Sequence, residues 1–204
     1  MELERVLVTG GSGFIGRYLM AELKSRGATV LGTCVGPEPS ADFVSVTLFD
    51  RKKLTQIIEE FQPTWIVHLA AIALVTHGNV EQIYAVNVLG SENLFNSVID
   101  ANIDKPTMLL ASTAGVYGNQ NEQYLSENLP YNPTNHYSYS KMIMEMVAKG
   151  YSDKLKIHTV RPFNVIGTGQ AESFLVPKIV KHFREKRELL QLGNIDSIRD
   201  YVQA

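Results

Sequence analysis

Short apolar segments alternate with longer amphipathic segments along most of this 204-residue chain. The short segments, such as "RVLVTG" at residues 5–10, are apolar on both faces, which is typical of strands buried in a parallel sheet. The longer segments carry apolar residues at helical spacing, as in "FIGRYLMAELKSRG" at residues 14–27. This alternation predicts an α/β fold, with a doubly wound parallel sheet covered by helices on both faces.

The expected strands cover residues 5–10, 28–35, 43–49, 64–71, 107–113 and 156–163, and the expected helices lie near residues 14–27, 51–61, 80–101 and 137–151. Asp50 stands directly before the second helix and is a candidate cap for it. Long connections and polar turns begin near Asn164. We therefore expect one domain over residues 1–163 and the start of a second, substrate-binding lobe over residues 164–204.

The composition is that of an ordinary globular protein, with 45% hydrophobic residues, 20% charged residues and a formal net charge of -2. This balance argues against nucleic acid or an anionic membrane as the main partner. The most basic segment, "KHFREKRE" at residues 181–188, alternates in sign and predicts a solvent-exposed helix face. No residue pattern indicates a metal site.

Three features favour a cytoplasmic location. The one cysteine, Cys34, excludes an internal disulfide and favours a reducing compartment. Met1 lies too close to the first expected strand to leave room for a signal peptide. No apolar run approaches the ~18 residues that a membrane span needs.

Gly10, Gly13 and Gly16 form the pattern G-x-x-G-x-x-G directly between the first expected strand and the first expected helix. A tight turn must leave the strand there, and the backbone must approach a pyrophosphate without a Cβ in the way. The helix N-terminus then offers its unpaired N–H groups and positive dipole to the phosphates. The context predicts a dinucleotide-binding site rather than a purely structural turn.

A second pattern, "YSYSK", contains Tyr137 and Lys141 at the spacing Y-x-x-x-K. In a helix the two side chains share a face, one turn apart. A nearby ammonium, together with a nicotinamide cation, favours tyrosinate and can make the phenol an acid/base group. The pair alone is common by chance, so its position relative to other motifs matters.

Together, "TGGSGFIG", "ASTAGVYG" and "YSYSK" resemble the extended branch of the short-chain dehydrogenase/reductase family, the NAD-dependent epimerase/dehydratase family of nucleotide-sugar enzymes. The resemblance implies a Rossmann-type fold and a catalytic set of Thr113, Tyr137 and Lys141. Thr113 would orient the sugar oxygen that becomes a carbonyl, and Ser112 is its neighbouring alternative.

The resemblance extends over nearly the whole chain and implies further site residues. "HLAA" at residues 68–71 resembles a segment that borders the cofactor, in which His68 is expected to be a packed structural residue. Asn87 is expected to support the helix near Lys141. Asn164, in "RPFNVIGTGQ", and Arg199, in "LGNIDSIRDYV", are expected to contact the substrate diphosphate. The expected cofactor-binding residues are Gly10, Gly13, Phe14, Ile15, Gly16, Leu69, Ala70, Ala71, Asn87, Tyr137, Lys141 and Phe163, and the expected substrate-binding residues are Ser112, Thr113, Asn164 and Arg199.

One departure from the family pattern narrows the expected reaction. Dehydratases of this group carry an acid next to the catalytic hydroxyl, whereas Thr113 is followed here by Ala114 and Gly115. This leaves a reductase of a 4-keto-6-deoxy-hexose or a C4 epimerase, both acting on a nucleotide-diphosphate sugar. The segments around Asn164 and Arg199 resemble the branch that handles GDP-linked 4-keto-6-deoxymannose, which favours the reductase. A non-catalytic NAD(P)-binding sensor remains an alternative of another class.

Cofactor preference depends on the end of the second strand, where an Asp would favour NAD. Cys34 or Val35 stands there, and Thr47 stands where the family places an adenine-contacting Asp. NADP(H) is therefore favoured over NAD(H), although no Arg replaces the acid. Family members continue past the R-D-[FYW] motif, so we expect an incomplete C-terminal lobe. The family also implies a homodimer through the helices near residues 88–101 and 137–151.

Overall fold

The structure is a computed structural model that describes residues 4–38, 40–74, 78–120, 122–193, 196 and 198–204. The chain divides into two compact units, Met1–Arg161 and Pro162–Ala204. The expected functional division of the chain, into a cofactor domain and a substrate lobe, stays a prediction.

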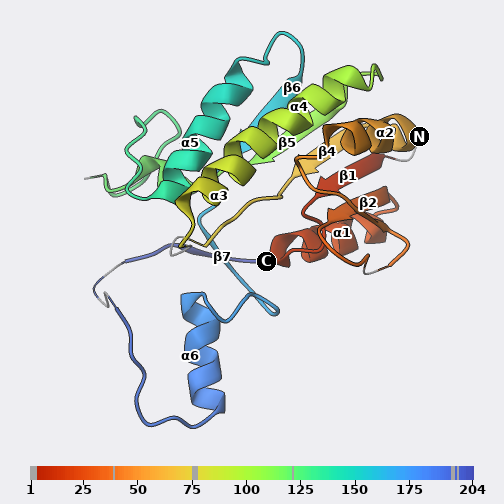
Figure 1. The fold of residues 1–204 in the computed structure, drawn as a ribbon. Helices are drawn as coiled ribbons and strands as arrows, with labels where there is room; N and C mark the ends of the chain where they lie inside the picture. Colours follow the sequence, from red (N-terminus) through yellow and green to blue (C-terminus); the bar gives the residue numbers. More distant parts are fainter. Residues whose placement is uncertain (1–3, 39, 75–77, 121, 194–195, 197) are drawn as a thin grey trace. The chain divides into compact units, whose positions relative to one another are not determined.

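The first unit contains a six-stranded sheet in the order β3-β2-β1-β4-β5-β6, in which all neighbouring strands are parallel (Figure 1). The strand order runs outward from β1 in both directions, so the chain direction across the sheet reverses between β1 and β4. In such sheets the carboxyl ends of the strands open a crevice at this reversal, where ligands bind. The strands are β1 (Arg5–Thr9), β2 (Thr29–Cys34), β3 (Phe43–Ser45), β4 (Trp65–His68), β5 (Thr107–Ala111) and β6 (Lys156–Val160).

The helices of the first unit lie on the two faces of this sheet, as Figure 1 shows. They are α1 (Phe14–Ser25), α2 (Arg51–Phe61), α3 (Val80–Tyr84), the π-helical η1 (Ala85–Gly90), α4 (Ser91–Asp100), the short 3₁₀ turn η2 (Ala114–Tyr117) and α5 (His136–Lys149). The expected α/β fold with a doubly wound, Rossmann-type parallel sheet is confirmed.

The alternating direction of side chains along the strands explains why helices cover both faces of the sheet. Leu7 on β1 packs into the larger apolar core together with side chains of α2, α4 and α5, such as Leu54 and Phe95. Its neighbours Val6 and Val8 point to the opposite face and pack against Met20 of α1. Because successive residues of a strand face opposite sides, an all-apolar strand needs helices on both sides of the sheet.

Two expected strands differ from the structure. The third strand was expected over residues 43–49 but ends at Ser45, and Val46 and Leu48 instead enter the larger core from the connection to α2. The segment at 156–163 was expected to be a buried strand, yet most residues of β6 are exposed. The reason is position: β6 is the last strand of the sheet, so within the described first unit it has one neighbour only.

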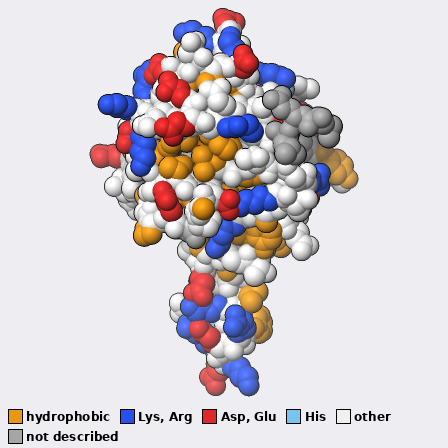
Figure 2. Space-filling view, turned by 90° about the vertical axis from the view of Figure 1, so that its right-hand side faces the viewer, with side chains coloured by type: hydrophobic (Ala, Val, Ile, Leu, Met, Phe, Trp, Pro, Cys, Tyr) orange, Lys and Arg blue, Asp and Glu red, His pale blue; other side chains and the backbone are white. Residues whose placement is uncertain are grey.

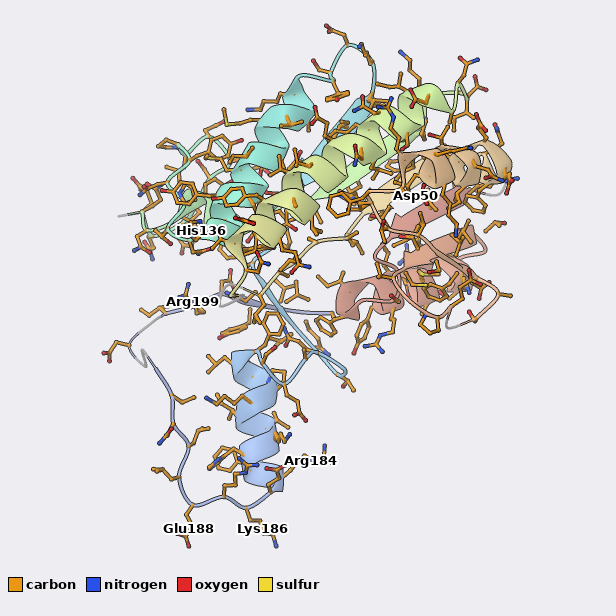
Figure 3. The ribbon with its side chains drawn as sticks, in the orientation of Figure 1. Asp50, His136, Arg184, Lys186, Glu188 and Arg199 are labelled. Carbon is orange, nitrogen blue, oxygen red and sulfur yellow. The ribbon has the colours of Figure 1, made fainter. Side chains whose placement is uncertain are left out.

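The second unit contains a parallel pair of short strands, β7 (Asn164–Ile166) and β8 (Tyr201–Gln203), and the helix α6 (Leu175–Arg184). The charged segment at 181–188 is helical only to Arg184, and its lysine, arginine and acid side chains are interspersed around the end of α6 (Figure 2). Arg184, Lys186 and Glu188 extend away from the helix (Figure 3). None of the helices among the described residues is long and apolar enough to cross a membrane.

The start of α2 shows how a local signal in the sequence fixes an element. Asp50 is the N-terminal cap, and its carboxylate accepts a hydrogen bond of 3.0 Å from the backbone N–H of Lys53, as expected (Asp50 is labelled in Figure 3). The helix buries Leu54, Ile57 and Ile58 in the larger core. The cap therefore sets the point from which this apolar face is presented to the sheet.

Replacing the cap, Asp50→Ala, should lower the free energy of unfolding by about 1 kcal/mol, because the Lys53 N–H loses its acceptor. Urea denaturation followed by circular dichroism measures the change. Asp104→Ala is a matched control, since Asp104 is an exposed aspartate outside any helix. Equal effects of the two substitutions would contradict the role of Asp50.

Candidate active site

The glycine turn between β1 and α1 brings backbone segments into close contact. Gly10 adopts a φ of +71°, and a Cβ there would lie 2.8 Å from the backbone N of Ala70. A Cβ on Gly16 would lie 2.4 Å from the carbonyl oxygen of Gly10. The N–H of Gly13 donates to that same carbonyl at 2.9 Å, which closes the turn. Backbone atoms thus exclude a side chain at Gly10 and at Gly16, so the tight turn and the close packing of α1 against it require glycine at both positions.

The N-terminus of α1 follows this turn directly. It contains no acidic residue in its first turn, and no side chain caps it. The first N–H groups of a helix have no partner within the helix, and they carry the positive end of the helix dipole. Phe14 and Ile15 are the first two helical residues, so their N–H groups are suited to an anion.

The end of β4 lies beside this turn, at the reversal in strand order. The Leu69 N–H donates to the Thr9 carbonyl at 3.1 Å, and the Ala70 N–H donates to the Thr9 hydroxyl at 3.4 Å. The structure therefore brings the expected cofactor residues Gly10, Leu69 and Ala70 together. Ala71 follows them in the chain and is half-buried.

The expected catalytic residues meet where α5 crosses the end of β5. Lys141 is 2% exposed, and its Nζ donates to the carbonyl of Ala111 at 2.8 Å. Tyr137, one turn earlier on α5, shares a hydrogen bond with the side chain of Thr113. The Thr113 hydroxyl also accepts from the N–H of Gly115 at 3.1 Å and so caps η2. Thr113, Tyr137 and Lys141 therefore lie in one place.

The protein environment shifts both titratable groups toward their neutral forms. Burial raises the pKa of Tyr137 to about 12, and the hydrogen bond with Thr113 offsets only part of this effect. Burial lowers the pKa of Lys141 to about 8, while the negative charge of Glu145 acts in the opposite direction. The pKa of Tyr137 thus moves away from neutral pH, opposite to the direction that an acid/base role needs. The protein's own groups do not suffice to favour tyrosinate.

Asn87 connects the catalytic helix to the cofactor side of the sheet. It lies within the π-helical turn η1, and its side chain accepts from the Ile72 N–H at 2.8 Å and donates to the Ile72 carbonyl at 3.1 Å. It also donates to the Ser140 hydroxyl at 2.9 Å, next to Lys141 on α5. The expected helix at 80–101 is therefore interrupted at a polar contact, which is typical of π-bulges near functional sites.

His68, at the end of β4, is fully buried, as expected of a packed structural histidine. Its Nδ1 lies 2.6 Å from the Thr9 hydroxyl and its Nε2 lies 2.8 Å from the Ser91 hydroxyl. Burial lowers the pKa of His68 to about 3, and the positive charge of Lys141 acts in the same direction. His68 is therefore neutral at neutral pH and links the strand before the glycine turn to α4.

Ser112 does not fit the role expected of it. It is 3% exposed, and its hydroxyl donates a hydrogen bond to Glu145 of α5. The side chain is thus turned into the protein and is not presented to a ligand beside Thr113. Ser112 and Thr113 directly follow the end of β5, and their hydroxyls have different partners: Glu145 for Ser112 and the Gly115 N–H for Thr113.

Sequence reasoning missed Glu145 and Arg161. Glu145 follows Lys141 by four residues, so the spacing Y-x-x-x-K-x-x-x-E was a signal that a third polar residue shares this face of α5. Its partner Arg161 follows β6 and is distant in sequence. Their contact becomes visible only in the fold.

The remaining expected residues lie in the second unit. The side chain of Asn164, on β7, donates to the Asp200 carbonyl at 2.9 Å. Arg199 is exposed and stands two residues before β8 (Figure 3). Phe163 is half-buried. Their expected contacts with cofactor or substrate stay predictions.

The parallel sheet, its strand reversal and the glycine turn define a Rossmann-type dinucleotide-binding fold. A model of the NAD dependent epimerase/dehydratase family matches residues 6–204. The chain belongs to this family, which confirms the resemblance drawn from the motifs.

Relatives differ in the reaction that they are named for. A GDP-6-deoxy-D-talose 4-dehydrogenase of Aggregatibacter actinomycetemcomitans is 43% identical over 199 residues, covering 97% of this chain and 65% of the relative. A GDP-6-deoxy-D-mannose reductase of Pseudomonas aeruginosa is 30% identical, covering 98% of this chain and 66% of the relative. A UDP-glucose 4-epimerase of Lactobacillus helveticus is also 30% identical, covering 98% of this chain and 68% of the relative. The chain thus spans about two thirds of the length of these relatives.

Solved structures support the same fold. A Burkholderia cenocepacia protein is similar with a TM-score of 0.87 at 34% identity, covering 98% of this chain and 67% of the other. The UDP-glucose 4-epimerase of Thermotoga maritima, solved with UDP-glucose, is similar with a TM-score of 0.84 at 25% identity, covering 97% and 69%.

The buried neutral His68 predicts a dependence of stability on pH. Its pKa is about 3 in the folded protein against an ordinary value of 6.5, so the unfolded chain binds the proton more readily. The stabilisation from neutral His68 is complete at pH values above its pKa in the unfolded chain. It is lost progressively as the pH falls from that pKa toward the pKa of His68 in the folded protein. We expect the free energy of unfolding to fall by about 2 kcal/mol between pH 7 and pH 5 from this group.

Urea unfolding at the two pH values checks this. His68→Gln should remove that part of the pH dependence, whereas His158→Gln, at an exposed histidine of β6, should leave it unchanged. Parallel pH profiles for wild type and His68→Gln would contradict the assignment.

Proposed function

We propose that the protein is an NAD(P)-dependent nucleotide-sugar oxidoreductase that transfers a hydride at carbon 4 of the sugar, as a reductase of a 4-keto-6-deoxy-hexose. The observation that carries the proposal is the meeting of Thr113, Tyr137 and Lys141 at the end of β5. This strand lies beside β4, whose end contacts the glycine turn. A phenol, a hydroxyl and an ammonium thus stand at the same edge of the sheet as the turn suited to a pyrophosphate.

The relatives favour a 6-deoxyhexose linked to GDP. The relative at 43% identity is named for oxidation at carbon 4 of GDP-6-deoxy-D-talose, and another is named as a GDP-6-deoxy-D-mannose reductase. Ala114 and Gly115, after Thr113, offer no acid for a dehydration, which agrees with a redox step alone.

The glycine turn suits a dinucleotide, because the first turn of α1 that follows it has no acidic residue and no side-chain cap, so its first N–H groups suit a pyrophosphate. In the proposal the N–H groups of Phe14 and Ile15 hold its pyrophosphate. When bound there, a nicotinamide would supply the hydride for carbon 4, and its oxidised ring would supply a positive charge that favours tyrosinate.

The chain's own residues handle the oxygen and its proton. In the reduction the Thr113 hydroxyl donates a hydrogen bond to the ketone oxygen. The Tyr137 hydroxyl gives its proton to that oxygen as the carbonyl becomes a hydroxyl, leaving a tyrosinate. The Lys141 ammonium stabilises this tyrosinate until a proton from solvent restores the phenol.

NADP(H) is the proposed cofactor, in preference to NAD(H). The side chain at the end of β2 is the thiol of Cys34, which is directed to backbone carbonyls of its own loop and of Val44. A thiol in place of an acid at this position removes one source of repulsion against a 2′-phosphate.

A homodimer and a cytoplasmic location complete the proposal. Leu89, Tyr139 and Met146 are between 42% and 56% exposed on η1 and α5, which suits helix pairing between two copies.

The buried Cys34 is not in a disulfide, in keeping with a reducing compartment.

A C4 epimerase is the second candidate, favoured by a UDP-glucose 4-epimerase relative at 30% identity. A reductase consumes one reduced cofactor for each sugar, whereas an epimerase returns the hydride and consumes none. Absorbance at the reduced-cofactor band, recorded with GDP- and UDP-linked sugars, distinguishes the two.

Tyr137→Phe should lower kcat at least about 100-fold, because the ketone oxygen loses its proton donor. The dissociation constant of NADPH should change less than about twofold, because one hydroxyl is removed from a site held mainly by the glycine turn. Tyr124→Phe is the matched control: Tyr124 lies outside α5 and is 81% exposed. Unchanged turnover in Tyr137→Phe would overturn the catalytic assignment.

A further inference from the structure

Glu145 is a buried carboxylate at the centre of a polar cluster beside the expected catalytic residues. It lies on α5 and is 3% exposed. It accepts a hydrogen bond from the Ser112 hydroxyl and another of 2.8 Å from the Tyr131 hydroxyl. Arg161 donates to both of its oxygens, with 2.6 Å from Nη2 to Oε2 and 3.1 Å from Nε to Oε1.

Arg161 is itself held by two tyrosines. Its guanidinium carbon lies 5.0 Å from the centre of the Tyr117 ring and 5.1 Å from that of Tyr131. Its nitrogens also donate to the two phenol oxygens, at 2.7 and 2.9 Å. A buried ion pair persists where both charges find further hydrogen bonds, and this pair has them.

The charge state of Glu145 follows from these contacts. Burial alone would raise its pKa, but hydrogen bonds from Arg161, Ser112 and Tyr131 outweigh burial and hold the pKa below the usual value. Glu145 is therefore a carboxylate at neutral pH.

The spacing along α5 connects this cluster to catalysis. Tyr137, Lys141 and Glu145 are four residues apart and so share one face of the helix. They contact three consecutive residues at the end of β5: Tyr137 contacts Thr113, Lys141 contacts the Ala111 carbonyl, and Glu145 contacts Ser112. Glu145 thus holds Ser112, which lies between the Ala111 carbonyl that binds Lys141 and the Thr113 hydroxyl that the proposed chemistry uses.

We propose that Glu145, anchored by Arg161, is a positioning residue of the active site, which fixes the end of β5 through Ser112 and keeps a negative charge beside Lys141. The inference rests on the proposed function, because Thr113 and Lys141 act there. Glu145 itself touches neither cofactor nor substrate in this account.

The charge beside Lys141 separates this role from a merely structural one. Around Lys141 the titratable and charged groups are His68 on β4, Tyr137 and Glu145 on α5, and Arg161 after β6, which is paired with Glu145. His68 is neutral, so Glu145 is the negative charge that opposes the effect of burial on the Lys141 ammonium. A neutral residue at 145 should let Lys141 lose its proton at lower pH.

Steady-state kinetics of the full chain test the positioning role. Glu145→Gln should lower kcat about tenfold, because misplacement of a supporting group by a fraction of an ångström weakens proton transfer. KM for the cofactor should stay within about twofold, because the glycine turn is untouched. The fall of kcat at alkaline pH should begin at lower pH than in wild type, since the ammonium is lost earlier.

Ser112→Ala provides a second variant that removes one hydroxyl only, in case Glu145→Gln does not fold. If Glu145 acts through Ser112, the double variant should lose about as much kcat as the worse single variant. Ser97→Ala is the matched control: Ser97 is fully buried on α4, and its hydroxyl donates to the Asn93 carbonyl at 2.8 Å. Its kcat should stay at the wild-type value. The proposal would be overturned if the two single-variant losses of kcat multiplied in the double variant. It would also be overturned if Glu145→Gln, like Ser97→Ala, kept the wild-type kcat.

A readout without turnover separates this inference from the proposed function. In protein labelled with ¹³C at lysine Cε, Lys141→Arg identifies the Lys141 resonance, whose wild-type titration should have a midpoint of about 8. Glu145→Gln should lower that midpoint by about one pH unit. An unchanged midpoint would overturn the positioning role even if the enzyme turns over. A lowered midpoint in a protein without turnover on any nucleotide sugar would reject the proposed function alone.

Discussion

The hydrogen bond from the buried ammonium of Lys141 to the carbonyl of Ala111 is the contact on which the site depends. It ties α5 to the carboxyl end of β5, with a charged group that is 2% exposed. A buried ammonium is costly unless it is hydrogen-bonded, so this helix and this strand end cannot separate without loss of stability. The contact fixes where Tyr137 and Thr113 meet.

The sheet topology places this contact at the same edge of the sheet as the glycine turn. β1, β4 and β5 are adjacent and parallel, so the glycine turn, the "HLAA" segment and the Thr113 segment all follow strand ends at one edge of the sheet. Polar links hold these segments together behind the edge. His68 joins Thr9 to Ser91, and Asn87 joins the Ile72 backbone to α5. The cofactor side and the catalytic side are thus parts of one hydrogen-bonded framework.

Local patterns predicted those parts of the fold that local forces decide. Apolar runs predicted the parallel sheet, the Asp50 cap predicted the start of α2, and the glycine context predicted the turn after β1. The exposure of β6 depends on its place at the sheet edge, which no local pattern carries. The inward direction of Ser112 and its contact with Glu145 depend on the packing of α5 against β5. The raised pKa of Tyr137 depends on burial, which the spacing to Lys141 in the sequence does not reveal.

The most direct test is a crystal structure of the protein with NADPH and a GDP-linked 6-deoxyhexose. The account predicts the pyrophosphate within hydrogen-bonding distance of the backbone N–H groups at the start of α1. It also predicts the sugar's C4 oxygen against the hydroxyls of Thr113 and Tyr137. A dinucleotide bound away from the glycine turn, or a sugar whose carbon 4 lies beyond the reach of Tyr137, would contradict it.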